Sequence, residues 1–149
     1  MSLTTAQLAT FATAINADSN LTAYVASQNA GAIANYYNGA SATEIWNPSI
    51  PIAQLNDAIV WSEFAGLTVA LQNTYMAMTM GTSVDATNAN IRNGFSTVFT
   101  GKTTLTNLTA LAQRLATVFE ALFTTANVCS LDGYNVSVQD VIAAMGWKD

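Results

Sequence analysis

Apolar residues recur at intervals of three and four along most of the chain, a spacing typical of amphipathic helices. Four such stretches run into a glycine or a cluster of polar residues, where a helix is expected to stop. Their apolar positions are Leu8, Phe11, Ala12 and Ile15; Ile33, Ala34 and Tyr37; Leu67, Leu71, Tyr75 and Met78; and Ile91, Phe95, Val98 and Phe99. The pattern therefore predicts a mainly α-helical protein.

The longest periodic stretch covers residues 103–125. Its apolar residues are Leu105, Leu108, Ala112, Leu115, Phe119 and Leu122. Since no glycine or proline interrupts this stretch, the spacing predicts one continuous helix, which we expect to be the central packing element.

Strand structure is expected only near the C-terminus. Val128–Leu131 and Tyr134–Val136 flank Asp132-Gly133, a dipeptide that tolerates the positive φ angles of a tight hairpin turn. The sequence therefore predicts at most one small β-hairpin.

A last helix is predicted after this hairpin. Ser137 and Asp140 have the spacing of a capping box, and Gly146 is placed to end the helix. Trp147 follows that stop, where it either folds back onto the protein or meets a partner. Asp85 or Thr87 is the expected N-cap of the helix that carries Ile91.

Both prolines lie in the stretch from Glu44 to Phe64, together with two of the three tryptophans. Pro48 and Pro51 lack a backbone N–H and push the preceding residues toward extended geometry, so residues 47–50 are expected to form a stiff connector between helices. A helix is expected from Pro51 to about Val60. The connector can act as a docking element, or Trp46 and Ile50 can close the domain's own core.

The length of 149 residues is that of one domain, residues 1–149. The predicted fold is a compact multi-helix bundle with an extended proline-containing connector. Charged residues make up 9% of the chain, whereas about 25% is typical. Because solvated charges oppose association, such a surface is expected to pack readily against neighbouring subunits.

The net charge of −5 argues against tight binding of nucleic acid. The four basic residues are scattered along the chain: Arg92, Lys102, Arg114 and Lys148. The N-terminus lacks a positively charged start, and eighteen consecutive apolar residues occur nowhere. Neither a signal peptide nor a membrane span is predicted.

The residue types of common catalytic and metal sites are scarce. The chain has no histidine and a single cysteine, Cys129, so zinc sites of the usual kind and internal disulfides are excluded. The serines lack a histidine base, and Gly101-Lys102-Thr103 lacks the glycine spacing of a phosphate-binding loop. The sequence predicts no catalytic residues, no cofactor and no metal.

Several segments, in this order, resemble a family of small structural proteins that tailed bacteriophages encode in their late, virion-building gene clusters. They are Tyr36-Tyr-Asn-Gly-Ala-Ser41, Ile45-Trp-Asn-Pro-Ser-Ile-Pro51, Asn56-Asp-Ala-Ile59 with Trp61, Asn88-Ala-Asn-Ile-Arg-Asn-Gly94, Arg114-Leu-Ala-Thr117, Glu120-Ala-Leu-Phe123 and Ser137-Val-Gln-Asp-Val141. The resemblance covers most of the chain, but it rests on the order of segments that are individually common. The chain departs from the family at Asn47-Pro48, where other members carry an aromatic and a basic residue.

The resemblance implies a non-enzymatic virion protein, assembled in the cytoplasm of the bacterial host. The expected role is a ring-forming head-to-tail connector subunit beneath the portal. Its partners would be copies of itself and neighbouring virion proteins such as portal and tail proteins, with DNA only as passing cargo and no membrane contact. The alternatives are a tail-completion or decoration protein of the virion, or a free helical protein-binding module.

Six residues are predicted at subunit interfaces: Trp46, Pro48, Ile50, Pro51, Arg92 and Trp147. We expect Arg92 to point to the polar side of its helix, because Ile91 and Phe95 occupy the inner side. Its charge should pair with Asp57 or Glu63 within the subunit, or with an acid of a neighbour.

Overall fold

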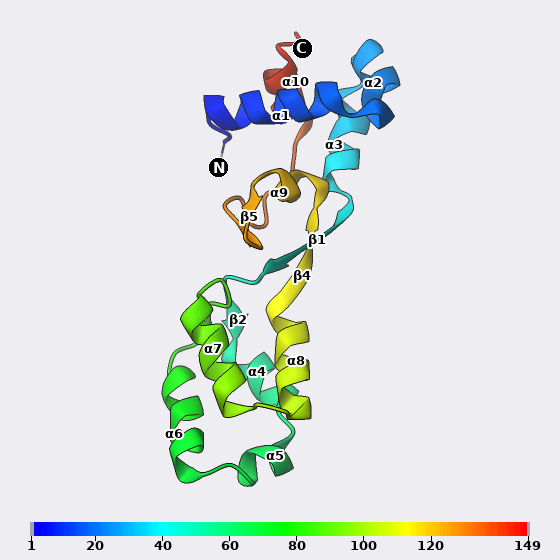
Figure 1. Ribbon diagram of the computed structural model, residues 1–149. Helices are drawn as coiled ribbons and strands as arrows, with labels where there is room; N and C mark the ends of the chain where they lie inside the picture. Colours follow the sequence, from blue (N-terminus) through cyan, green and yellow to red (C-terminus); the bar gives the residue numbers. More distant parts are fainter. Residues whose placement is uncertain (1, 149) are drawn as a thin grey trace. The chain divides into compact units, whose positions relative to one another are not determined.

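The computed structural model describes residues 2–148, which are mainly α-helical (Figure 1). Their helices are α1 (Thr5–Ala17), the 3-10 helix η1 (Ser19–Leu21), α2 (Thr22–Ala26), α3 (Ala30–Asn38), α4 (Ile52–Ala58), α5 (Trp61–Ala65), α6 (Val69–Met78), α7 (Ala89–Val98), α8 (Thr103–Ala112), α9 (Val118–Leu122) and α10 (Val138–Met145). The strands are β1 (Ala40–Trp46), β2 (Ile50–Pro51), β3 (Ser83–Val84), β4 (Gln113–Thr117), β5 (Thr124–Thr125) and β6 (Val128–Cys129).

The single domain over residues 1–149 stays a prediction, and the structure shows that the chain divides into two compact units. Unit 1 contains both ends of the chain, Met1–Thr43 and Leu115–Asp149, and unit 2 is the middle, Glu44–Arg114. The division has a physical basis, because buried apolar side chains gather in two separate clusters, one in each unit. The chain passes between the units within β1 and β4, which pair as a two-stranded sheet.

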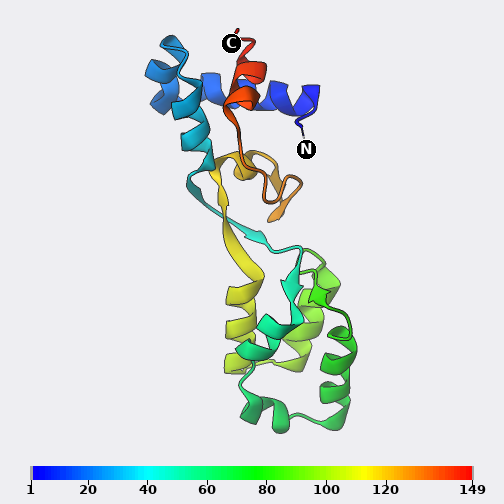
Figure 2. The same ribbon diagram turned by 180° about the vertical axis from the view of Figure 1, so that it is seen from behind.

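Unit 1 is built from α1, α2, α3, α9 and α10, and both ribbon views show α10 lying across α1 (Figures 1 and 2). Aromatic rings form the centre of its core. Phe11 of α1 meets Tyr37 and Phe119 edge to face, at centroid distances of 4.8 and 5.0 Å. Such edge-to-face contacts add to the stabilisation from burial alone, so these rings tie α1 to α3 and α9.

A buried carboxylate organises the turns of unit 1. Glu120 is 1% exposed, and its side chain accepts hydrogen bonds from the backbone N–H groups of Thr117 (2.8 Å) and Gly133 (2.6 Å). The first of these bonds belongs to the capping box that starts α9. The second holds the 131–134 turn, so one side chain fixes both a helix start and a distant loop.

Unit 2 is built from α4 to α8 and the short antiparallel pair β2–β3, in which Ile50 lies opposite Val84. Helix α6 packs on α7, and α4 packs on α8. The core contains Tyr75, whose ring contacts Phe95 and Phe99 edge to face. Gly94 leaves room for the Met78 side chain, because an added Cβ would stand 2.6 Å from the Met78 methyl carbon and this flexible side chain would have to shift.

Glu63 of α5 caps the start of α8 from a distance in the sequence. Its carboxylate accepts the backbone N–H groups of Thr103 (2.9 Å) and Thr104 (2.8 Å) and the Thr104 hydroxyl (2.6 Å). The same hydroxyl accepts the N–H of Val60 at 3.0 Å. Thr104 is fully buried, and Lys102 at the N-cap position offers no side-chain bond. A glutamate therefore supplies the acceptor that the helix start lacks.

The prediction of one helix over residues 103–125 was wrong. The chain is helical in α8, extended in β4 and helical again in α9. Residue Gln113 adopts φ −117° and ψ 150°, and Thr117 accepts the N–H of Glu120 as a new N-cap. Periodicity placed Leu115 on the inner face of a helix, whereas Leu115 is 53% exposed and the neighbouring Ala116 is buried, as in a strand.

The hairpin was predicted at the wrong residues, and strands occur outside residues 128–136. Strand β6 pairs with β5, with Thr124 opposite Cys129. Their two-residue turn is Ala126-Asn127, at φ 50° and 62°, as type I′ turns require. Gly133 does adopt a positive φ of 75°. Its N–H donates to the Glu120 side chain, and no strand follows it directly in the chain.

Two boundaries were predicted correctly: the Ser137–Asp140 capping box starts α10, and Gly146 ends α10 in the left-handed conformation. The side chain of Thr4 caps α1. The expected N-cap of α7 was wrong by one to three residues, because Asn88 caps it and Asp85 instead accepts the N–H and hydroxyl of Thr87. After Pro51, α4 begins at Ile52 and ends at Ala58.

Replacing Thr104 by Val should lower the free energy of unfolding by about 1–3 kcal/mol, because the N–H of Val60 and the Glu63 carboxylate each lose a buried partner. Urea titration of the purified protein measures this change. The matched control is Thr106→Val, an exposed threonine of the same helix. Equal midpoints for the two variants would contradict the role of the Thr104 hydroxyl.

The contribution of Glu63 should depend on pH. Its bonds with the Thr104 hydroxyl and with the backbone of Thr104 and Thr103 lower the pKa of its carboxyl from the ordinary value of 4.5. A pKa that is lower in the folded state stabilises the fold above the unfolded value, and this stabilisation is lost as the pH falls through the folded pKa. The stability difference between the wild type and Glu63→Gln should therefore be largest near neutral pH and shrink below pH 4.5. A difference that stays constant down to strongly acidic pH would contradict this account.

Candidate functional site

A half-open apolar pocket lies in unit 2, between the start of α7, the strands β2 and β3, and α8. Its volume is about 60 Å³. The lining residues are Trp46, Ile50, Leu55, Val84, Ala86, Ile91, Arg92, Phe95, Leu105, Leu108, Thr109 and Ala112. Trp46, Ile91, Leu105 and Ala112 are half-buried, so they form the rim, whereas Ile50, Leu55 and Phe95 form a buried floor.

Arg92 lies over the Trp46 ring at this rim. The guanidinium carbon stands 4.5 Å from the ring centroid, within the range of a cation–π contact. Nη1 of Arg92 also donates to the backbone oxygens of Ala86 (2.7 Å) and Thr87 (2.9 Å). These bonds fix the turn before α7 and hold the arginine in place beside the indole.

The expected pairing of Arg92 with Asp57 or Glu63 was wrong. The guanidinium bonds to backbone carbonyls, and Glu63 is engaged at the start of α8. The physical reason is local. Thr87 and Ala86 precede Arg92 by only five and six residues, so their carbonyl oxygens lie within reach of the Arg92 side chain. Sequence spacing gave no information about these acceptors.

The structure brings three of the six predicted interface residues together. Trp46, Ile50 and Arg92 line the pocket, and Ile50 is 3% exposed within the core of unit 2. Pro48 and Pro51 are exposed on either side of Ile50. Trp147 is in unit 1, where it is half-buried against the core. Sequence reasoning missed the α8 wall of the pocket, although the Leu105 and Leu108 periodicity could have indicated it.

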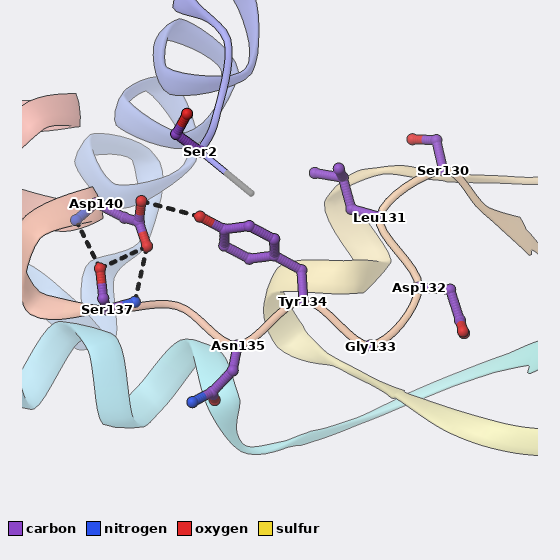
Figure 3. Close-up of a pocket in the computed structure, with 9 residues that line it drawn as sticks. All are labelled: Ser2, Ser130, Leu131, Asp132, Gly133, Tyr134, Asn135, Ser137 and Asp140. Carbon is purple, nitrogen blue, oxygen red and sulfur yellow. Dashed lines mark hydrogen bonds between the residues drawn. The ribbon is translucent and has the colours of Figure 1, made fainter.

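A second, larger recess lies in unit 1 and has a polar lining (Figure 3). Its volume is about 560 Å³, and among its lining residues the Tyr134 side chain points toward Asp140. Asp140 accepts the Tyr134 hydroxyl (3.0 Å) and the N–H and hydroxyl of Ser137 (2.8 and 2.7 Å). Burial and this carboxylate raise the pKa of Tyr134 to about 12, so the phenol remains a donor. Asp140 is thus engaged as a helix cap.

The thiol of Cys129 has no features of a nucleophile. Burial raises its pKa, and Sγ donates a weak hydrogen bond to the backbone oxygen of Glu120 at 3.4 Å. A reactive cysteine requires the thiolate, which a raised pKa disfavours. Within residues 2–148, no cluster of three or more metal-ligating side chains is found, and no helix is long and apolar enough to cross a membrane.

Comparisons with protein-family models, curated proteins and solved structures found no match for this chain. The resemblance to the phage family therefore stays a prediction from the segments quoted above. Among the described residues, the Trp46–Arg92 pocket remains the feature in which predicted interface residues coincide with an accessible apolar surface.

Replacing Arg92 by Ala should lower the free energy of unfolding by about 1–3 kcal/mol, since two carbonyls lose a charged donor and the indole loses its cover. Thermal and urea unfolding measure this loss. Asn93→Ala, at the exposed neighbouring position of α7, is the matched control. If both variants unfold at the same midpoint, the Arg92 contacts do not stabilise unit 2.

Proposed function

We propose that this protein is a structural subunit of a tailed-bacteriophage virion and forms a ring in the head-to-tail connector. The observation that carries the proposal is the pocket in unit 2. It gathers Trp46, Ile50 and Arg92, which come from two of the segments that resemble the phage family. An apolar pocket with an aromatic and an arginine at its rim has the composition of a protein-binding hot spot.

Exposed apolar side chains elsewhere in unit 2 also support a role in assembly. Val69 and Met76 are seven residues apart on α6, hence on the same helix face, and both are exposed. Met80, just beyond the helix, is 84% exposed. No charged residue occurs between Gly66 and Val84, so little charge must be desolvated when this surface is covered. Subunit contacts of this kind fit a ring with heterologous interfaces.

Several carboxylates already accept hydrogen bonds from backbone or hydroxyl groups of the protein, which supports a non-enzymatic role. Glu63 and Asp140 cap helices, and Glu120 is buried among backbone donors. The proposed partners are other copies of this chain and neighbouring virion proteins, with DNA as passing cargo that the net charge of −5 would not retain.

A free helical binding module is the second candidate, because a half-open pocket can also bind a partner outside a particle. The two candidates differ in where the protein is found. Mass spectrometry of purified phage particles should detect the proposed connector subunit at the constant, low copy number of one ring. Absence from particles, with the protein in the soluble lysate, would support the free module and contradict the virion proposal.

The variant Trp46→Ala separates docking from folding. If the rim of the pocket docks in the particle, the folded variant should be excluded from particles, because truncating a central interface tryptophan can cost more than about 2 kcal/mol of binding. Incorporation and thermal stability are measured on the same protein. Thr104→Val is the control, since it weakens unit 2 at a fully buried position. Normal incorporation of Trp46→Ala would contradict docking through this rim.

A further inference from the structure

The guanidinium of Arg92 has unused hydrogen-bonding capacity at the pocket. Both of its bonds to the described residues come from Nη1, which leaves Nη2 and Nε without a hydrogen-bond acceptor there. Arg92 is half-buried and lines the pocket together with apolar side chains. Since a guanidinium presents its donors as a planar fork that matches a carboxylate, the site is complementary to an acid placed beside an apolar group.

The size of the pocket limits the apolar group. One water molecule needs about 10–15 Å³ of such space, so a volume of about 60 Å³ holds several non-hydrogen atoms. This is enough for one side chain of the size of valine or leucine. The Trp46 and Leu105 side chains at the rim would contact the rest of the partner segment that carries this apolar side chain.

We propose that this pocket binds an extended segment of a neighbouring protein that presents an apolar side chain directly beside a carboxylate. The apolar side chain enters between Trp46, Ile91 and Leu105, and the carboxylate accepts from the free edge of Arg92. That the neighbour is a virion protein rests on the function proposed above, whereas the chemistry of its segment does not.

A second copy of the chain offers no matching segment on α5, α6 or α10. Trp61 and Val138 are exposed and each has an acid two residues on, but Glu63 is bound at the start of α8 and Asp140 is bound to Ser137 and Tyr134. The exposed residues of α6 have no acid nearby in the sequence, because residues 66–84 carry no charge. The charge requirement therefore favours a different protein as the occupant.

The probe for this inference is N-acetyl-leucine, which has both features of the segment. Its matched controls are N-acetyl-leucinamide, which lacks the negative charge, and N-acetylglycine, which lacks the apolar side chain. Each is titrated to millimolar concentration into the ¹⁵N-labelled full chain, and backbone resonances are followed by NMR. A net charge of −5 disfavours general binding of an anion, so a preference for the acid reports a local site.

N-acetyl-leucine should shift the resonances around Trp46, Ile91 and Leu105 saturably, about three- to tenfold more tightly than the amide. N-acetylglycine should not saturate. The preference for acid over amide should disappear in Arg92→Gln, whose fold is checked from the resonances of unit 1 and α6. The comparison of acid and amide in the wild type needs no variant, so an unfolded Arg92→Gln would not remove the test.

Equal affinity for acid and amide, or shifts outside the pocket, would overturn the proposal. The proposal would also be overturned if sedimentation showed multimers of this chain that N-acetyl-leucine dissociates, because the pocket would then hold a second copy. A protein present in particles at ring copy number that shows no saturable binding would leave the proposed function intact and remove this inference alone.

Discussion

The fold depends on hydrogen-bond partners for the backbone polar groups where the chain passes from one unit to the other. Both passages lie in extended segments, β1 and β4, whose polar groups need partners. In unit 1, Val118 N–H donates to Gly39 O (2.9 Å), and the Ser41 hydroxyl donates to Ala116 O (2.9 Å). In unit 2, Asn47 donates from its backbone and side chain to the carbonyls that end α8 (2.8 and 3.0 Å). Each unit therefore supplies its own hydrogen-bond partners for the chain where it passes to the other unit.

Carboxylates do structural work throughout this charge-poor chain. The carboxylates of Glu63, Glu120 and Asp140 each accept a backbone N–H at the start of a helix, in α8, α9 and α10 respectively. A negative charge at a helix start is favoured by the unpaired N–H groups and the helix dipole. Because the chain has only nine acids, using three in this way leaves few charges for the surface. The exposed apolar residues Val69 and Met76 of α6 lie in a stretch, residues 66–84, that carries no charge at all.

The candidate site was predictable in part. Trp46, Ile50 and Arg92 stood out in the sequence as a proline-bounded aromatic segment and an arginine within an amphipathic helix, and the structure brings them to one pocket. What could not be predicted was the set of partners. Arg92 finds two carbonyls of the preceding turn, which have no signature in side-chain types. Ile50 is buried because β2 pairs with β3, a contact that joins residues over thirty positions apart.

The helical character and the capping of α1 and α10 follow from residue types alone, because capping and apolar spacing are local properties. Thr4, Ser137 and Gly146 have the roles that their residue types predict. The division into two units and the break at residues 113–117 depend on contacts between residues far apart in the sequence. The apolar residues of this stretch fit a helix as well as a strand, so local pattern cannot separate the two. Pairing of β4 with β1 does separate them, since it satisfies the backbone of both passages and lets α8 and α9 enter different cores.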